Sequence, residues 1–376
     1  MALWFFYGFS EEKPQFFENM SRSSPCNDIV INNQVNIFRQ GKTLILKLKS
    51  ATLRDVAQAA GVSLITASRA LGNPVIVSAK TRERVRQAVE ATGYIPNMLA
   101  GGLKSKRSLT VAGITPGLSV TEFLPMLQAL TSDLAGEGYQ LLLGETGYDP
   151  AREATVLDTM IGRQPDGIVV VGLVQTQRAR DRLRRSGLPV VELWELSDRP
   201  VDMSVGFSHL KVGGTLGGYF VSKGWKHVGV ISGSDSRARL RTEGFTAAFG
   251  GHVPMAVVQP PSNLERGRRA LAELLQQAPN LEAVCCTSDM LANGVLTEAR
   301  ARGMRVPQDL AVCGFGNTDF SAYTVPSITT VHVDGPEMGR LAARLIMDRC
   351  RGKAAEQSII DVGFRLIERE STGAAA

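Results

Sequence analysis

From Ser108 onward, the chain alternates short apolar runs with amphipathic stretches. Seven runs rich in Val, Ile and Leu are LTVAGIT, YQLLLGE, DGIVVVGLV, LPVVELW, HVGVIS, EAVCCTS and DLAVCGF. Stretches with helical spacing lie between them, among them FLPMLQALTSDLAGEG and SNLERGRRALAELLQQ. Such apolar runs are typical of parallel strands that are buried on both faces. The pattern predicts a doubly wound α/β region over residues 109–370, whose length suits two lobes better than one sheet.

Residues 51–95 show a different pattern, with the signals of three short helices. Thr52 and Asp55 form a capping box at the start of the first helix. Ser63 can cap a second helix, LITASRAL, after a short gap, and a third helix ends before Gly93. This spacing predicts a helix-turn-helix domain.

Residues 1–50 carry many aromatic side chains but no sustained helical or strand period. They match a secretory signal poorly, because no basic segment precedes the apolar start and no small-residue cleavage site follows it. We assign no fold to this segment. It is expected to be a poorly ordered extension, or the product of a start codon placed too far upstream.

The distribution of charge points to a partner. The 376-residue chain has a net charge of +6, and residues 51–107 alone hold nine Lys and Arg against three Asp and Glu. A basic small segment beside a nearly neutral large one favours binding to a polyanion such as DNA.

Two further features of the composition bear on location. No apolar run approaches the ~18 to 20 residues that a membrane helix needs, so a soluble protein with no membrane partner is expected. The five cysteines are scattered and never form C-x-x-C, which fits neither a disulfide framework nor a zinc site. The reducing cytoplasm is therefore the expected location.

The motifs of common enzymes are absent from the sequence. It contains no GxxxxGKS/T phosphate loop, no HExxH and no GxSxG, and its four histidines are isolated from one another. The glycine pairs Gly213-Gly214 and Gly217-Gly218 lie in a predicted helix and lack the GxGxxG order of a dinucleotide-binding turn. We therefore expect neither an enzyme nor a cofactor or metal site.

The run TLRDVAQAAGVSLITASRALGNPVIVSAKTRERVRQAVEATGYIPNMLAGGLKSKRS resembles the DNA-binding headpiece and hinge of the LacI/GalR family of bacterial transcription regulators. Downstream, GYQLLLGETGYDP, CTSDMLANG, RVPQDLAVCGFGN and PSITTVHVDGPEMG are similar to the effector domain of that family. LPVVELW, PVDMSVGFSHLKVG and DVGFRL are most similar to repressors of gluconate utilisation. The resemblance implies a helix-turn-helix headpiece over residues 51–95, a hinge helix and linker over residues 96–108, and a two-lobed effector domain like that of periplasmic binding proteins.

The resemblance also implies which residues meet DNA. Leu64, Ile65 and Arg69 take the base-reading positions of the second helix. The guanidinium fork of Arg69 can bridge guanine O6 and N7, whereas the two apolar side chains can read only shape and a thymine methyl. Ordinary packing within the headpiece is the alternative for Leu64 and Ile65. The positions that hold phosphates, which fix register without reading sequence, are Thr52, Thr66, Ser68 and Asn73.

The segment from Asn97 to Leu103 matches the hinge helix of the family, and Leu103 matches the leucine that wedges into the minor groove. Gly101 and Gly102 depart from the usual pattern. Each costs about 0.8 to 1 kcal/mol relative to alanine in a helix, so the hinge helix is expected to form poorly off DNA. A flexible linker is the alternative.

For the effector, the resemblance implies contacts from Phe123, Trp194, Phe207, Arg241 and Asp289. Arg241 would clamp a carboxylate or hydroxyls, Asp289 would accept from sugar hydroxyls, and the aromatic rings would form apolar walls. A surface ion pair between Arg241 and Asp289, with the rings as core filler, is the alternative. The strand register decides whether Glu192 or Glu195 faces the pocket.

These observations lead to three functional hypotheses. The first is a homodimeric repressor that binds a palindromic double-stranded operator and is controlled by a sugar-acid effector such as gluconate. The second is a sugar-binding transport receptor, since such receptors share the two-lobed design. The third is an enzyme, which would need a catalytic cluster between the lobes.

Overall fold

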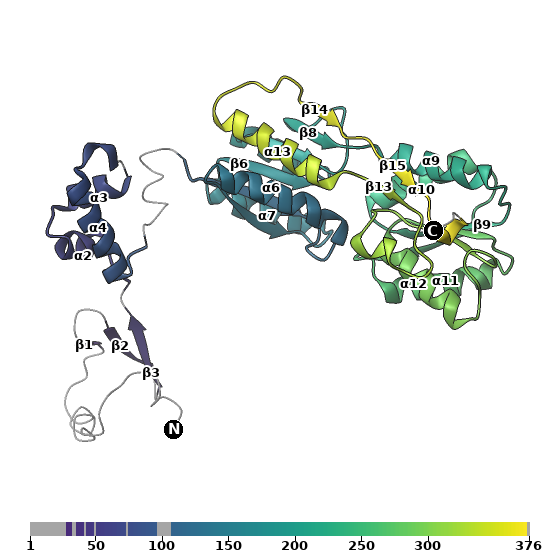
Figure 1. Ribbon diagram of the computed structural model, residues 1–376, viewed down its shortest axis with the longest axis horizontal. Helices are drawn as coiled ribbons and strands as arrows, with labels where there is room; N and C mark the ends of the chain where they lie inside the picture. Colours follow the sequence, from purple (N-terminus) through teal and green to yellow (C-terminus); the bar gives the residue numbers. More distant parts are fainter. Residues whose placement is uncertain are drawn as a thin grey trace. The chain divides into compact units, whose positions relative to one another are not determined.

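The structure is a computed structural model that describes residues 28–31, 35–40, 43–48, 50–72, 74–95 and 107–373 (Figure 1). The chain forms two compact units, which are residues 1–105 and 106–376.

The first unit contains a three-stranded antiparallel sheet that the side-chain pattern does not predict. Strands β1 (Asp28–Ile31), β2 (Val35–Gln40) and β3 (Thr43–Leu48) pair in chain order. Backbone groups make this pairing, so strands can form without the alternation of apolar and polar residues by which a sequence reveals them. That residues 1–50 as a whole are poorly ordered stays a prediction.

Three helices follow, and they confirm the predicted helix-turn-helix. They are α2 (Leu53–Ala59), α3 (Leu64–Gly72) and α4 (Ala79–Thr92), with the short 3-10 helix η1 (Pro74–Ile76) before α4. Asp55 accepts hydrogen bonds from the N–H and the hydroxyl of Thr52 at 2.8 and 2.7 Å. Ser63 Oγ accepts the N–H of Thr66 at 3.1 Å, and Ser78 caps α4. The capping side chains therefore begin each helix where the sequence signals place its start.

The core of this headpiece lies mainly between α2 and α4. Val56 of α2 and Ala60, which follows this helix, pack with Val85 and Ala88 of α4, and all four are buried. Ala67 is the fully buried residue of α3. Most of α3 therefore presents its side chains to the surroundings.

The second unit contains two fully parallel sheets, which confirms the predicted doubly wound, two-lobed architecture. The six-stranded sheet of the first lobe has the order β14-β8-β7-β6-β4-β5, and the four-stranded sheet of the second lobe has the order β10-β9-β11-β12. The strands are β4 (Thr110–Thr115), β5 (Gln140–Glu145), β6 (Gly167–Val171), β7 (Val190–Leu193), β8 (Met203–Gly206), β9 (Val228–Gly233), β10 (Met255–Val258), β11 (Ala283–Cys286), β12 (Ala311–Cys313) and β14 (Ile359–Asp361). Each of the seven apolar runs contains a strand, whereas β8, β10 and β14 were not predicted.

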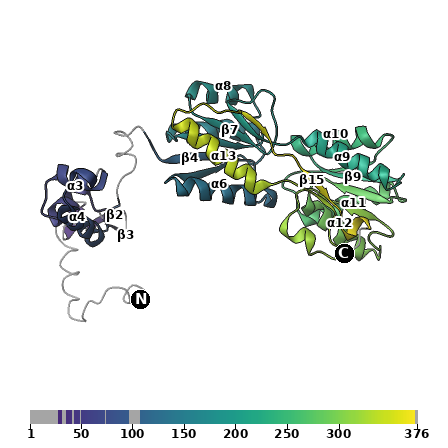
Figure 2. The ribbon, with the colours of Figure 1, turned by 45° about the horizontal axis from the view of Figure 1, so that its top comes forward.

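Helices cover both faces of each sheet (Figures 1 and 2). They are α6 (Leu124–Gly136), α7 (Pro150–Gly162), α8 (Gln177–Ser186) and α13 (Gly335–Cys350) in the first lobe, and α9 (His209–Ser222), α10 (Ser236–Phe249), α11 (Leu264–Gln277) and α12 (Asp289–Ala301) in the second. In β6, Val169 packs in one core with α6 and α13, and the adjacent Ile168 packs in another with α7 and α8. Because alternate residues face opposite layers, both must be apolar, which explains the continuous apolar runs.

The chain passes between the lobes three times. The passages join β8 to α9, β13 (Thr330–His332) to α13, and β14 to β15 (Arg365–Ile367). After the second passage α13 returns to the first lobe and packs against α6, although the two helices lie far apart in the sequence (Figure 1). Short 3-10 helices complete the unit: η2 (Thr121–Phe123), η3 (Asp319–Ala322) and η4 (Glu370–Thr372).

The paired glycines of α9 serve helix packing. A Cβ added to Gly213 would lie 1.9 Å from the carbonyl oxygen of Arg241, and one added to Gly217 would lie 2.5 Å from that of Phe245. Both contacts are too short for any side chain, so α9 approaches the backbone of α10 closely only because it carries glycine there. This contact fixes the position of α10 at Arg241.

No helix in the described part of the chain is long and apolar enough to span a membrane. The same residues contain no group of three or more His, Cys, Asp and Glu that could hold a metal ion.

Candidate functional site

The first candidate site is the outward side of α3 in the headpiece. Leu64 and Ile65 are 47% and 63% exposed, and Ser68 and Arg69 are exposed further along the helix. The exposure of the two apolar residues disfavours their alternative role as core packing. Apolar side chains exposed at the start of the second helix of a helix-turn-helix suit contact with a groove.

The remaining residues predicted to contact DNA fall into two groups. Thr52 and Thr66 lie at the starts of α2 and α3, where both take part in the capping hydrogen bonds. The N-terminus of a helix also attracts phosphate, so these positions remain suitable for backbone contacts. Asn73, Asn97 and Leu103 lie outside the described residues, and the predictions made for them stay untested.

Some cationic side chains of the headpiece form ion pairs or hydrogen bonds with groups of the headpiece itself. Arg86 pairs with Glu83 and Glu90, both at 2.5 Å, and Arg84 donates to the carbonyl oxygens of Ala60 and Gly61. The net charge of the segment is unchanged by these contacts. The cationic side chains that face a polyanion are therefore fewer than the sequence count.

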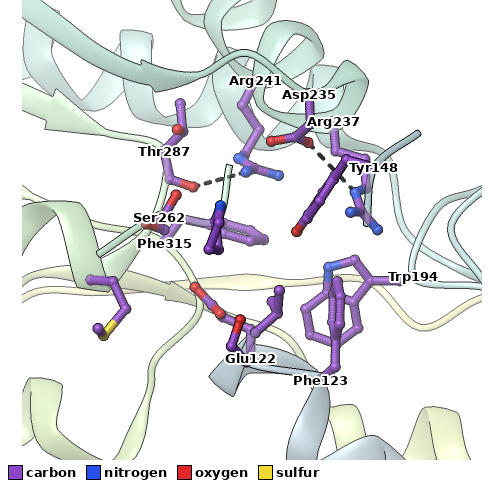
Figure 3. A pocket seen from close by; sticks show the side chains of 15 residues that line it. Glu122, Phe123, Tyr148, Trp194, Asp235, Arg237, Arg241, Ser262, Thr287 and Phe315 are labelled. Atoms are coloured by element: carbon purple, nitrogen blue, oxygen red, sulfur yellow. Dashed lines mark hydrogen bonds and ion pairs between the residues drawn. The ribbon is translucent and has the colours of Figure 1, made fainter. Parts of the chain in front are cut away.

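The second candidate site is a cavity of about 50 Å³ between the two lobes (Figure 3). Its lining residues follow the carboxyl ends of parallel strands, which is where open α/β sheets bind ligands. They are Ser119, Val120, Glu122, Phe123, Tyr148 and Trp194 from the first lobe, and Asp235, Arg237, Arg241, Pro261, Ser262, Thr287, Ser288, Met290 and Phe315 from the second.

Arg241 is held by contacts from three elements. Its Nη1 lies 2.8 Å from His209 Nδ1, its Nη2 donates to the carbonyl oxygen of Thr287 at 2.8 Å, and its guanidinium carbon lies 4.1 Å from the centre of the Phe315 ring. Burial, and secondarily the charge of Arg241, lowers the pKa of His209 well below its usual range. His209 is therefore neutral and accepts from Arg241. Burial also lowers the pKa of Arg241 to about 10, so the guanidinium stays charged at neutral pH.

Arg237 is a second guanidinium at the cavity, one helical turn before Arg241. It extends from the second lobe toward the first, where its guanidinium carbon lies 5.1 Å from the centre of the Phe123 ring. Its Nε lies 3.7 Å from Asp235 Oδ1. Nη1 of Arg237 and Nε of Arg241 are buried without a hydrogen-bond partner among the described residues. Two guanidinium groups that line the cavity therefore each keep a buried donor without a partner.

Aromatic rings form one wall of the cavity. Trp194 packs edge to face against Phe123 and Phe207, with ring centres 5.0 and 5.7 Å apart. Trp194 and Tyr148 both have left-handed backbones, with φ of 70° and 61°. Bulky residues rarely adopt this conformation, and such strain concentrates at ligand sites.

Phe207 and Asp289 do not line the cavity, contrary to the position that direct effector contact requires. Phe207 is fully buried behind Trp194. Asp289 is also fully buried, and it accepts hydrogen bonds from Thr318 N–H and Oγ1 and from Thr330 Oγ1 at 2.7 to 3.1 Å. Asp289 therefore fastens the start of α12 to β13, and its neighbours Ser288 and Met290 reach the cavity instead.

Glu122 faces the cavity opposite Arg241 (Figure 3). Burial raises its pKa to about 7, and the nearby Asp289 adds to the effect. A carboxyl group between the lobes thus titrates near neutral pH.

A second cavity of about 260 Å³ adjoins the first and shares Tyr148, Asp235 and Arg237 with it. Glu195 lines this second cavity, and burial raises its pKa. Glu192 instead points away, fully buried, and accepts from the N–H groups of Val174 and Val201. The strand register therefore directs Glu195, and not Glu192, toward the space between the lobes.

The sequence thus located Phe123, Trp194 and Arg241 at the cavity but missed Glu122, Tyr148 and Arg237. Arg237 carried a usable signal, since it stands four residues before Arg241 and such residues share a helix face. Glu122 and Tyr148 lie in connections after strands, where no periodicity reports the direction of a side chain.

Comparison with known proteins identifies the family of the chain. Residues 52–97 match the family described as bacterial regulatory proteins, lacI family, and residues 218–372 match the periplasmic binding protein-like domain. The chain is similar to the HTH-type transcriptional regulator GntR of Pseudomonas aeruginosa, with 34% identity over 327 residues that cover 85% of this chain and 95% of that protein.

Two solved structures extend the comparison. A LacI-family transcriptional regulator from Silicibacter pomeroyi has a TM-score of 0.81 and 32% identity, covering 86% of this chain and 99% of that one. The Lac repressor dimer bound to operator and the anti-inducer ONPF has a TM-score of 0.74 and 25% identity, covering 87% and 100%. The chain therefore belongs to the LacI family of bacterial regulatory proteins and is a DNA-binding transcription regulator rather than an enzyme.

Proposed function

We propose that this regulator represses transcription as a homodimer, and that a sugar acid such as gluconate controls it by binding between the lobes. Two headpieces suit the two halves of a palindromic operator, with Leu64, Ile65 and Arg69 at base edges. An effector that prefers one arrangement of the lobes shifts the population toward it and so changes operator affinity.

The two buried guanidinium groups on α10 are the reason for proposing an acid as the effector. Arg237 and Arg241 are only 7% and 8% exposed, yet each keeps a donor without a partner. An unsatisfied buried donor costs about 1 to 3 kcal/mol, and more on a charged group. A carboxylate removes this cost through charge-assisted hydrogen bonds, which are stronger than those that a neutral hydroxyl makes.

The surroundings of the two guanidinium groups suit the rest of a sugar acid. Ser262 and Glu122 add polar groups to the cavity, and Trp194 and Phe315 add apolar walls. The adjoining cavity provides space that the first lacks. The resemblance of LPVVELW and DVGFRL to repressors of gluconate utilisation supports gluconate among the possible acids.

Thermal-shift and calorimetric screening of the purified protein tests this function. Gluconate and other sugar acids are expected to raise the melting temperature, because a ligand at 100 times its Kd stabilises the fold by about 2.7 kcal/mol. A rise with glucose or galactose, and none with gluconate, would contradict the anionic effector.

A gel-retardation assay separates the regulator from a transport receptor of the same two-lobed design. The regulator retards an operator fragment, and its effector changes the retardation. A receptor binds sugar without retarding DNA.

A further inference from the structure

The carboxyl group of Glu122 is placed between the two lobes by contacts with both of them. It extends from η2 of the first lobe and meets Gly316 of the second, where an added Cβ would lie 2.5 Å from Glu122 Cγ. Gly316 has φ of 124°, and the bare glycine leaves room for the carboxyl group. Glu122 therefore lies where the two lobes meet, on the side of the cavity opposite the guanidinium groups (Figure 3).

Its carboxylate has little support from the protein. Among the described residues, its hydrogen bonds come from the backbone N–H of Glu122 itself and from Thr121 Oγ1, which donates to Glu122 Oε2 at a long 3.4 Å. No described cation forms an ion pair with it. The group is therefore available to a ligand, either as an acceptor or, when protonated, as a donor.

The charged groups around Glu122 come from several elements. Arg237 and Arg241 on α10 and Asp235 at its start face the cavity, and Asp289 lies behind it at the start of α12. The charge of Arg241 favours the ionised form of Glu122, and that of Asp289 opposes it.

Three other ionisable groups near the cavity keep one form at neutral pH. Arg241 stays charged and His209 stays neutral, for the reasons given above. Burial raises the pKa of Tyr148 to about 12, so its phenol stays protonated. Of these four groups, Glu122 is the one that can exchange a proton near pH 7.

We propose that the cavity binds both ends of a sugar acid. The carboxylate of the ligand lies between Arg237 and Arg241, and a hydroxyl group at its other end forms a hydrogen bond with protonated Glu122. Binding therefore takes up a proton. This inference rests on the proposed function and adds a residue that determines specificity. It defines the ligand class as a monoanion with a hydroxyl group at the end remote from its carboxylate.

The sign of the pH dependence follows from charge. A bound anion disfavours the ionised form of Glu122, so the pKa of this group is higher in the complex than its value of about 7 in the free protein. Below both values the group is protonated throughout, and affinity is constant. As pH rises above about 7 the free protein loses the proton that the complex keeps, and affinity falls by up to about tenfold per pH unit.

Calorimetric titration of the full-length protein with gluconate tests the proposal between about pH 6 and about pH 8.5. Pairs of buffers with different ionisation enthalpies report the number of protons taken up. We expect constant affinity near pH 6, a decrease above neutrality, and an uptake that approaches one proton. Glucitol, the neutral polyol with the same carbon chain, is expected to cause no uptake.

Three variants assign the proton to its group. Glu122→Gln keeps the size and a hydrogen-bonding group, so it is expected to bind gluconate with an affinity independent of pH and without uptake. Glu273→Gln changes an exposed glutamate of α11 and is expected to behave as the parent. Glu195→Gln tests the buried carboxyl group of the adjoining cavity and is expected to keep the uptake.

Each other result is decisive. Gluconate binding without proton uptake, or uptake that survives Glu122→Gln and disappears with Glu195→Gln, overturns this inference and leaves the sugar-acid effector intact. If no sugar acid binds at any pH, both proposals fail. The uptake measured on the parent protein decides the matter even if Glu122→Gln does not fold.

Discussion

The headpiece and the interlobe cavity present their candidate residues in opposite ways. Leu64, Ile65 and Arg69 follow one another closely in a single helix and are exposed. Around the cavity, residues as distant as Glu122 and Phe315 meet, and Arg237 and Arg241 are buried. A duplex approaches from outside and needs exposed groups, whereas a small effector is enclosed and needs buried, preorganised ones.

This difference predicts two kinds of energetics. Exposed cations of the headpiece act through long-range charge and counterion release, so salt should control their contribution. Buried guanidinium groups act at short range in a region with little water, where salt screens them less.

Operator affinity should depend steeply on salt. The nine bases against three acids of residues 51–107, present twice in a dimer, motivate the expectation. Affinity should fall on the order of 10³-fold or more between 50 and 200 mM salt if about six or more phosphates are contacted. Fluorescence anisotropy with a labelled operator measures it. An operator affinity that does not change with salt would contradict an electrostatic contribution of the headpiece. A gluconate affinity that falls as steeply with salt would contradict the difference between the headpiece and the cavity.

Arg241→Ala should abolish the effector response and leave operator binding without effector intact. Removing one partner of a buried charge interaction costs about 2 to 5 kcal/mol of ligand affinity. Arg300→Ala, which changes an exposed residue of α12, is the matched control. A normal effector response in the Arg241→Ala protein would show that Arg241 does not bind the anion.

Gly213→Ala and Gly214→Ala should differ in their effect on stability, although the two glycines are adjacent. A Cβ at Gly213 meets the carbonyl oxygen of Arg241, so the first change should destabilise the effector domain by about 1 to 3 kcal/mol or more. The nearest neighbour of a Cβ at Gly214 is 3.9 Å away, so the second should be neutral or stabilise the helix by up to about 1 kcal/mol. Thermal unfolding compares them, and equal melting temperatures would show that α9 does not need its glycine at Arg241.

Arg69→Ala should cost about 1 to 3 kcal/mol of operator affinity and relax the preference at one base pair. The reason is that a bidentate contact to guanine discriminates among bases. Binding to a set of operators, each with one base pair changed, measures the effect. An equal loss on every sequence would mean that Arg69 contacts phosphate.

Deleting residues 1–50 should have the smallest effect, leaving operator affinity and effector response within about a factor of two. Strands β1 to β3 pair with one another, and the headpiece buries its own core between α2 and α4. Loss of operator binding in the shortened protein would give the extension a function.

Features that depend on neighbouring residues could be predicted from the amino-acid sequence alone. Thr52, Ser63 and Ser78 cap helices within a few residues of themselves, so their signals placed the headpiece helices correctly. The apolar runs placed seven strands because burial on both faces requires consecutive apolar residues. The order of the glycines around Gly213 and Gly217 already excluded a dinucleotide-binding turn. The structure shows that these two glycines instead allow close packing of α9 against α10.

The side chains that come together between the lobes could not be predicted from the sequence. In the sequence, Asp289 and Arg241 are equally good candidates for an effector contact. In the structure, Thr318 and Thr330 donate hydrogen bonds to the Asp289 carboxylate, while Arg241 keeps a donor without a partner. The strand register turned Glu195 toward the second cavity and Glu192 into the core. Such outcomes depend on contacts between residues far apart in the chain, and no local preference encodes the burial or the partner of a charged group.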